Sequence, residues 1–350
     1  MTGGCGFVGS HVCIHYANKG AEVISFDNLT KHELARTGYD MDAARTYNWE
    51  LLKKLGVTAV KGDIRNRDEL IEAAKGCDYI VHTAAQPAMT ISIEAPELDF
   101  STNVLGTFNI LEAARKFDIP MVYCSTIHVY GNKINETLVE GETRYLCDPP
   151  AIDEQHPVMQ GTITPLHASK RSAEIYVQTY LDTYGLKAAV FRLTGLYGPW
   201  QFGGEDHGWV ANFTIRTIIE KPITIYGTGK QVRDILFVSD VAEAFHAFYR
   251  ARKPGIYNIG GGFDRSISLI ECIRLLEDIT GKKPVVNYGP ERLGDLRYFV
   301  CDISKAKASL GWAPKVCPRE GITHLSTWVK ENKQLFMDEA QQRQLMHKSL

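Results

Sequence analysis

Three glycines and one aspartate near the amino terminus have the types and spacing needed to bind a dinucleotide. Gly3, Gly6 and Gly9 stand in the stretch TGGCGFVG, and an apolar-faced helix is predicted to open at about Phe7. Such a turn lets backbone N–H groups and the positive end of a helix approach a pyrophosphate. The apolar run over residues 21–26 ends in Asp27, 18 residues past Gly9, where a carboxylate can accept hydrogen bonds from both hydroxyls of an adenosine ribose. That carboxylate repels a 2′-phosphate, so the pattern favours NAD over NADP.

The residues before this turn are unusual. A glycine turn of this kind normally follows a buried strand of about five or six residues, yet only Met1 precedes Thr2. We therefore expect the first strand to be missing from this chain, which would open the sheet at its centre and leave two unpaired edges. The corresponding hypothesis is that the natural reading frame starts upstream.

Two arginines in the second half of the chain, Arg233 and Arg292, suit the diphosphate of a nucleotide. Each guanidinium offers a planar fork of donors to phosphate oxygens. Asp295 and Arg297 follow on the same segment, and a surface ion pair among these residues is the alternative interpretation. These residues do not separate CDP from UDP, GDP or dTDP.

The composition of the whole chain is that of an ordinary globular protein. It has 350 residues, 44% of them hydrophobic and 23% charged, with a formal net charge of -2. This balance, without a long basic run, argues against a nucleic-acid or membrane surface. The eight cysteines form no CxxC pair, and no stretch resembles a signal peptide or a membrane span. We therefore expect reduced thiols, no metal site and a cytoplasmic protein.

Strand and helix patterns alternate along the chain as a parallel sheet requires. Strands are predicted over residues 57–60, 79–85, 120–125 and 186–193, and helices over 67–75, 105–116 and 164–184. This alternation predicts an α/β fold, a Rossmann-type doubly wound parallel sheet, with a smaller α+β substrate domain. The predicted boundaries are 1–194 for the NAD-binding domain, with 232–260 returning to it, 195–231 and 261–330 for the substrate domain, and 331–350 for a polar tail.

Together these motifs resemble the extended short-chain dehydrogenase/reductase family of NAD-dependent nucleotide-sugar epimerases and dehydratases. The resemblance covers nearly all of residues 2–330. Besides the glycine turn and Asp27, it rests on Gly62-Asp63-Ile64, His82-Thr83-Ala84-Ala85, Asn103 with Gly106-Thr107, Ser125-Thr126 before Val129-Tyr130-Gly131, Lys170, Arg233-Asp234, and Arg292 with Asp295. Within the family, residues 142–145 and 201–210 are similar to the CDP-sugar 2-epimerases.

The resemblance implies a set of binding residues. For NAD these are Gly3, Gly6, Phe7, Val8, Gly9, Asp27, Asn28, Asp63, Ile64, Ala84, Ala85, Asn103 and Lys170, and for a nucleotide-diphosphate sugar they are Gln86, Thr126, Arg233, Arg292 and Asp295. Thr126 would bond the reacting sugar hydroxyl, and Lys170 the nicotinamide ribose. Thr126 also ends a predicted parallel strand at its carboxyl edge, where open α/β sheets bind ligands. The sequence leaves open whether the protein forms a homo-oligomer.

One position departs from the family. The catalytic tyrosine belongs to a Tyr-x-x-x-Lys motif, and the residue four before Lys170 is Leu166, which transfers no proton. General-base assistance is worth about 10²–10⁴-fold, so an active enzyme needs another group. His167, in the first turn of the same helix, and His128, two residues after Thr126, are the candidates; the alternative is that both are structural. His167 is preferred as the base, and the rate of hydride transfer is then expected to fall in acid near the ordinary imidazole pKa of about 6.5.

The leading interpretation is an NAD-dependent nucleotide-sugar epimerase of the CDP-sugar 2-epimerase type, which oxidises a sugar carbinol and re-reduces the ketone on the other face. A 4,6-dehydratase is disfavoured, because Ile127-His128 stands where family dehydratases carry Asp-Glu as acid and base. The alternatives are another nucleotide-sugar 4-epimerase or dehydrogenase, and a non-catalytic protein that binds NAD and a nucleotide sugar.

Overall fold

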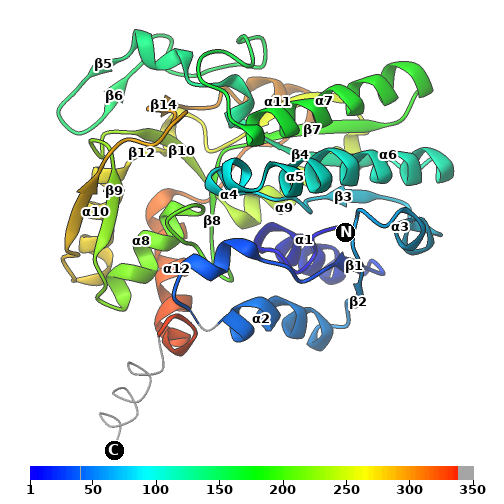
Figure 1. Ribbon diagram of the computed structural model, residues 1–350, viewed down its shortest axis with the longest axis horizontal. Coiled ribbons are helices and arrows are strands. Elements are labelled where there is room, and N and C mark those ends of the chain that lie inside the picture. Colours follow the sequence, from blue (N-terminus) through cyan, green and yellow to red (C-terminus); the bar gives the residue numbers. More distant parts are fainter. Residues whose placement is uncertain (40, 338–350) are drawn as a thin grey trace, which may run out of the picture.

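The main sheet of the computed structural model is parallel and largely buried. The structure describes residues 1–39 and 41–337. Strands β11 (Gly255–Ile259), β7 (Ala188–Leu193), β4 (Met121–Thr126) and β3 (Ile80–His82) pair in that order, and β1 (Ile24–Asp27) pairs with β2 (Thr58–Lys61), all parallel. The predicted doubly wound α/β sheet is thus confirmed (Figure 1).

Residues Met1–Gly3 lie between β1 and β3 and join the two groups of strands. Thr2 forms parallel bridges to Phe26 on one side and to His82 on the other. The backbone N–H of Gly3 donates to Phe26 O at 2.9 Å. The gap that the sequence predicts at the centre of the sheet is therefore closed at its carboxyl end, which is the end that carries the glycine turn.

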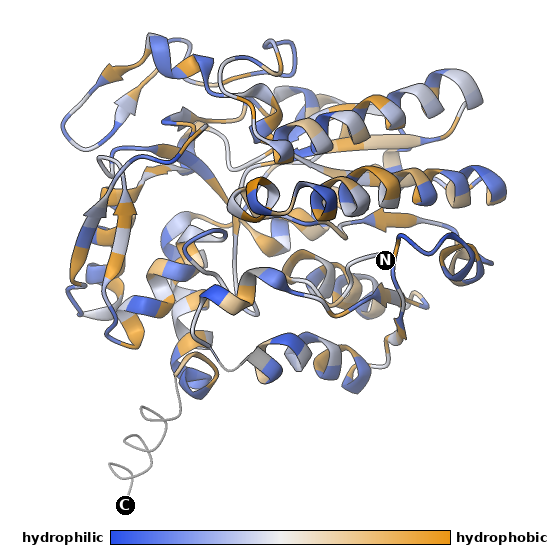
Figure 2. Ribbon diagram, in the orientation of Figure 1, coloured by the Kyte–Doolittle hydropathy of each residue, from blue (hydrophilic) through white to orange (hydrophobic). Residues whose placement is uncertain are grey.

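Successive residues of the central strands face opposite helical layers. Val122 and Cys124 of β4 pack with α1 (Phe7–Asn18) and α9 (Val238–Ala251), whereas Met121 and Tyr123 pack with α3 (Arg67–Ala74), α6 (Gly106–Phe117) and α7 (Pro165–Tyr184). Because side chains alternate along a strand, an entirely apolar strand can be covered on both faces. Figure 2 shows these central strands mostly in orange, while the covering helices also carry blue.

Further helices and one hairpin lie between residues 32 and 146. They are η1 (His32–Arg36), α2 (Met41–Lys54), α4 (Met89–Glu94), α5 (Pro96–Phe100), η2 (Ser101–Leu105), η3 (Ile127–Tyr130), η4 (Lys133–Thr137), and the hairpin of β5 (Val139–Glu140) and β6 (Tyr145–Leu146).

The second, smaller domain is built around β10 (Val232–Phe237). This strand pairs with β8 (Gly195–Tyr197), β12 (Ser266–Ser268) and β14 (Tyr298–Phe299), and nearby β9 (Ile223–Tyr226) pairs with β13 (Val286–Gly289). The remaining elements of this domain are α8 (Trp209–Ile218), η5 (Phe263–Arg265), α10 (Leu269–Thr280), α12 (Pro318–Glu331) and η6 (Lys333–Phe336).

Two predicted domain boundaries need correction. The chain returns to the first domain at α9 rather than at residue 232, because β10 hydrogen-bonds to strands of the second domain while β11 pairs with β7. Within the segment 261–330, α11 (Ser304–Leu310) buries Ala306 and Leu310 against the α9 side of the main sheet. A segment belongs to the domain whose strands it pairs with or whose core it packs against. Neither relation follows from the order of elements along the chain.

The predicted tail lies only partly within the described residues. Residues 332–337 follow α12, and 338–350 lie outside the described residues.

All eight cysteines are free thiols, and five of them are buried. In the part of the chain that the structure describes, no helix has the length and hydrophobicity to cross a bilayer.

Candidate functional site

A cleft of about 730 Å³ lies where the carboxyl edge of the main sheet meets the second domain. The predicted residues that line it at the cofactor end are Gly3, Gly6, Phe7, Val8, Gly9, Asp27, Asn28, Ile64, Ala84 and Ala85. The predicted residues that line the rest of the cleft are Gln86, Thr126, His128, Lys170, Arg233, Arg292 and Asp295. Asp63, Asn103 and His167 are not among the lining residues. Most of the predicted site is thus brought together in one space.

The glycine turn leaves no room for larger side chains. A Cβ on Gly9 would lie 2.0 Å from Gly3 O, and one on Gly3 would lie 2.6 Å from Ala84 N. Gly3 also has a φ of 66°, which L side chains rarely adopt. Helix α1 begins directly after Gly6, so the positive end of its dipole borders the cleft beside Phe7.

Asp27 is held at the end of β1 by main-chain donors. The N–H of Cys5 donates to Oδ2 at 2.9 Å, and the N–H of Leu29 donates to Oδ1 at 2.8 Å. The glycine turn and the residues after the strand therefore fix the same carboxylate from two directions, with its oxygens bordering the cleft.

Two predicted cofactor residues support the cleft from behind. Asp63 pairs with Arg65 at 2.7 Å and accepts from Asn28 at 3.0 Å, and the guanidinium holds the pKa of this carboxyl well below its usual range. The buried amide of Asn103 accepts from the N–H of Gln86 at 2.9 Å and donates to its carbonyl at 3.1 Å. Their partners Asn28, Arg65 and Gln86 line the cleft.

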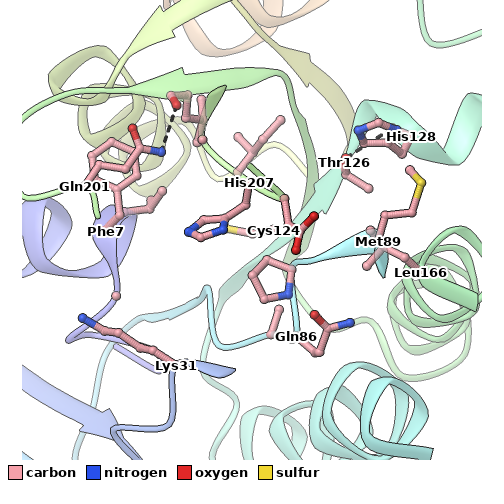
Figure 3. A pocket seen from close by; sticks show the side chains of 18 of the residues that line it. Phe7, Lys31, Gln86, Met89, Cys124, Thr126, His128, Leu166, Gln201 and His207 are labelled. Atoms are coloured by element: carbon pink, nitrogen blue, oxygen red, sulfur yellow. Dashed lines mark hydrogen bonds between the residues drawn. The ribbon is translucent and has the colours of Figure 1, made fainter. Parts of the chain in front are cut away.

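The reacting end of the cleft is formed by β4 and α7. Thr126 ends β4, and its Oγ1 accepts from the N–H of His128 at 3.2 Å. Lys170 on α7 donates to Cys124 O at 3.0 Å, and burial lowers the pKa of its ammonium. Figure 3 shows Thr126 and His128 on the same side of the cleft as Leu166 and Met89. Leu166 puts an apolar side chain where the family motif has its phenol.

A buried ion pair fixes α7 against the sheet. Glu174 of α7 accepts from Ser125 Oγ at 2.6 Å and from Arg192 at 3.0 and 2.8 Å. Glu174 also accepts from Arg171 at 2.8 Å, so removing Glu174 would leave the buried Arg192 uncompensated, at a cost of about 3–5 kcal/mol. The pair therefore keeps Lys170 and Thr126, one residue after Ser125, in a fixed relation.

The two candidate histidines occupy different environments. His167 is fully buried, and its Nδ1 accepts from the N–H of Thr164 at 3.2 Å, so it caps the first turn of α7. His128 lines the cleft, and its ring centroid lies 5.7 Å from that of His167, at 87°. His128 Nδ1 and His167 Nε2 each lack a hydrogen-bond partner among the described residues. Burial lowers the pKa of His128 to about 3 and that of His167 to about 4.

The far end of the cleft carries the two predicted arginines. Arg233 Nη2 lies 3.4 Å from Asp295 Oδ1, and burial raises the pKa of Asp295. Arg292 stacks on Tyr226 with Cζ 4.0 Å from the ring centroid, and its Nη2 lies 3.6 Å from Asp206 Oδ1. Both cations border the cleft, and each has a carboxylate neighbour.

Sequence reasoning missed several lining residues. His207 and Gln201 reach the cleft opposite Thr126, and Lys31 borders its cofactor side (Figure 3). Asp206 and Tyr226 line the arginine end. The similarity of residues 201–210 to the CDP-sugar 2-epimerases was the available signal for the first of these. The polar stretch after Asp27 has no periodicity that would single out Lys31.

Comparison with known proteins places the chain in a family. The sequence profile of the NAD dependent epimerase/dehydratase family matches residues 1–260. The chain belongs to this family. CDP-paratose 2-epimerase of Salmonella typhi is 36% identical over 344 residues, covering 94% of this chain and 98% of that protein. The dTDP-glucose 4,6-dehydratase of Escherichia coli is 31% identical over 357 residues, covering 95% and 94% respectively.

Solved structures agree with this assignment. A UDP-glucose 4-epimerase of Thermus thermophilus, in complex with NAD, matches with a TM-score of 0.75 at 34% identity, covering 93% of this chain and 97% of that one. The family is NAD-dependent, and the residues of the cofactor end fit that dinucleotide: a glycine turn that a Cβ would fill, a helix amino terminus and a fixed carboxylate. Because the relatives include epimerases and a dehydratase, family membership by itself leaves the reaction open.

Proposed function

We propose that this chain is an NAD-dependent epimerase of nucleotide-diphosphate sugars, acting on a CDP-sugar at C2. The observation that carries the proposal is the continuity of the cleft from Asp27, past Thr126 and Lys170, to Arg233 and Arg292. A dinucleotide and a nucleotide sugar can therefore meet end to end beside Thr126. The 36% identity to a CDP-paratose 2-epimerase supports the finer assignment, together with the cleft position of residues 201, 202 and 205–209.

NAD, when bound, would supply reversible two-electron oxidation of the sugar. The N-terminus of α1 and the glycine turn would hold its pyrophosphate, and Asp27 would accept from the adenosine ribose. Lys170 would donate to the ribose at the nicotinamide end, beside Thr126. Arg233 and Arg292 would hold the diphosphate of the sugar nucleotide, since guanidinium forks match phosphate oxygens. That anchor lets the sugar turn over between oxidation and reduction without leaving the cleft.

His128 is our choice for the group that moves the hydroxyl proton. Oxidation removes a hydride from the carbon and a proton from its hydroxyl; Thr126 would orient that hydroxyl and His128 would take the proton. Reduction on the other face returns both. His128 borders the cleft two residues from Thr126, whereas His167 uses Nδ1 to cap α7. Since burial makes His128 a weak base, we expect slower turnover than a tyrosine would support.

The test is single-turnover reduction of bound NAD by a panel of CDP-, UDP-, GDP- and dTDP-sugars, followed by NMR of the product. We expect a CDP-sugar to react fastest, with inversion at C2 and with the original hydrogen retained in D₂O. Elimination of water would show a dehydratase instead, and net accumulation of NADH a dehydrogenase. Failure of every sugar to reduce NAD, with tight binding of both ligands, would establish the non-catalytic alternative, which the apolar Leu166 favours.

Three variants test the proton-transfer residues. His128→Ala should slow hydride transfer about 10²–10⁴-fold with unchanged ligand binding, the usual range for a general base. His167→Ala should mainly lower the free energy of unfolding, by about 1 kcal/mol for a lost helix cap. Leu166→Tyr restores the family motif in front of Lys170 and should accelerate the reaction. If His128→Ala reacts as fast as wild type, His128 does not hold this role.

A further inference from the structure

A chain of alternating charges runs beside the cleft and ends at two of its lining residues, Asp206 and Arg292. Glu94 at the end of α4 pairs with Arg36 of η1, and Arg36 Nη1 lies 3.2 Å from Asp206 Oδ2. The other oxygen of the same carboxylate, Oδ1, lies 3.6 Å from Arg292 Nη2. Asp206 thus stands between a guanidinium of the first domain and one of the second, and its side chain is only 12% exposed.

The segment that carries Asp206 is fixed independently on both sides. Tyr39 donates to Gly203 O at 2.5 Å, and Glu205 accepts from Tyr226 Oη at 2.8 Å. The N–H of Gly204 donates to His207 O at 2.9 Å. Because neighbouring residues hold the segment, Asp206 is presented to Arg292 without depending on that ion pair for its own position.

We propose that Asp206 is an internal anion that occupies Arg292 until a nucleotide diphosphate replaces it. This deepens the proposed function and rests on its assignment of Arg292 to the diphosphate. A diphosphate oxygen and the Asp206 carboxylate compete for the same planar donors. Arg36 keeps Asp206 paired after the exchange, so the displaced carboxylate is not left uncompensated at the edge of the cleft. Tyr226, stacked on the guanidinium, keeps Arg292 in place for either anion.

The competition predicts that removing the carboxylate tightens binding. In Asp206→Asn, CDP and inorganic diphosphate should each bind about two- to fivefold more tightly by calorimetry, the range that a partly exposed ion pair is worth. Near 1 M salt, where the Debye length falls to about 3 Å, the gain should shrink. Glu94→Gln is the matched control: it touches the same Arg36 but not Arg292, so diphosphate affinity should stay at the wild-type value.

A double-mutant cycle separates this inference from the proposed function. Arg292→Gln should weaken CDP binding, and Asp206→Asn should bring no gain in that background, because the cation for which the two anions compete is gone. If Asp206→Asn unfolds at the wild-type temperature but binds CDP no more tightly than wild type, the inference is overturned. Arg292 then keeps its role as a diphosphate ligand. Unchanged CDP affinity in Arg292→Gln would overturn both the placement of the diphosphate and the inference.

Discussion

The two ends of the cleft position their charges in different ways. At the cofactor end, Asp27 is held by the backbone N–H groups of Cys5 and Leu29, which belong to the main chain of the fold itself. At the nucleotide end, Arg233 and Arg292 face the carboxylates of Asp295 and Asp206 at 3.4 and 3.6 Å. Main-chain donors move only with the backbone, whereas side-chain ion pairs can exchange partners.

The difference fits the proposed function. An epimerase that returns its electrons to the same sugar keeps its dinucleotide through the whole cycle, so a rigid cofactor end suits it. Under that proposal the nucleotide sugar enters and leaves in every cycle, and carboxylates that phosphate oxygens can replace would keep the arginines oriented between turnovers. Perturbing each end should therefore give different signatures.

Among changes at the two ends of the cleft, Gly9→Ala should have the largest effect. Its Cβ would meet backbone atoms at 2.0 and 2.7 Å, and neither neighbour can move without shifting the turn. Overpacking of this kind costs about 1–3 kcal/mol of folding free energy, and the displaced turn should lose NAD affinity more than about tenfold. Thermal unfolding and NAD calorimetry measure both. Gly195→Ala is the control, because its Cβ would meet nothing nearer than 3.5 Å; equal behaviour of the two variants would show that the turn is not rigid.

Arg233→Gln should act on the nucleotide end alone. Loss of a hydrogen bond to a charged group costs about 1.5–3 kcal/mol, so CDP should bind roughly tenfold or more weakly while NAD affinity stays constant. Arg297→Gln provides the comparison, since Arg297 pairs with Glu291 at 2.6 Å and does not line the cleft. A parallel loss of NAD affinity in Arg233→Gln would mean that the two ends are coupled.

Asp27→Asn tests the main-chain anchorage. The asparagine side chain lacks the negative charge that repels a 2′-phosphate. Its NH₂ group would also face one of the two main-chain N–H donors that hold Asp27. NAD binding should weaken and the ratio of NADP to NAD affinity should rise about tenfold, as expected for losing a charge-assisted bond. Competition calorimetry with both dinucleotides gives the ratio. An unchanged ratio would remove Asp27 as the source of cofactor selectivity.

The smallest effect is expected from moderate acid. An imidazole is neutral above its pKa, and burial lowers the pKa of His128 to about 3, so this ring stays able to accept a proton down to about pH 4. Single-turnover rates should therefore change less than about twofold between pH 8 and pH 5, with an acid limb only below that range. A limb near pH 6.5, which the sequence led us to expect for His167, would contradict the assignment of the proton transfer to a buried His128.

Local sequence patterns were sufficient for much of the main domain. The alternation of apolar strands and amphipathic helices predicts the parallel sheet, because each strand needs cover on both faces. Thr164 and Pro165 mark the start of α7, as their capping chemistry predicts. The turn of Gly3, Gly6 and Gly9 was readable because the close backbone approach at Gly3 and Gly9 leaves no room for a Cβ.

The sequence by itself therefore determined the family, the parallel sheet, the cofactor turn and the loss of the tyrosine at Leu166, since each depends on residue type at short range. Only the tertiary structure decided that β10 belongs to the second domain, because strand pairing joins distant segments. It also decided that His128 rather than His167 borders the cleft: Nδ1 of His167 is engaged by Thr164, whereas His128 lies at the carboxyl edge of β4. The contact of Asp206 with Arg36 and Arg292 likewise joins three distant segments, and no spacing along the chain encodes it.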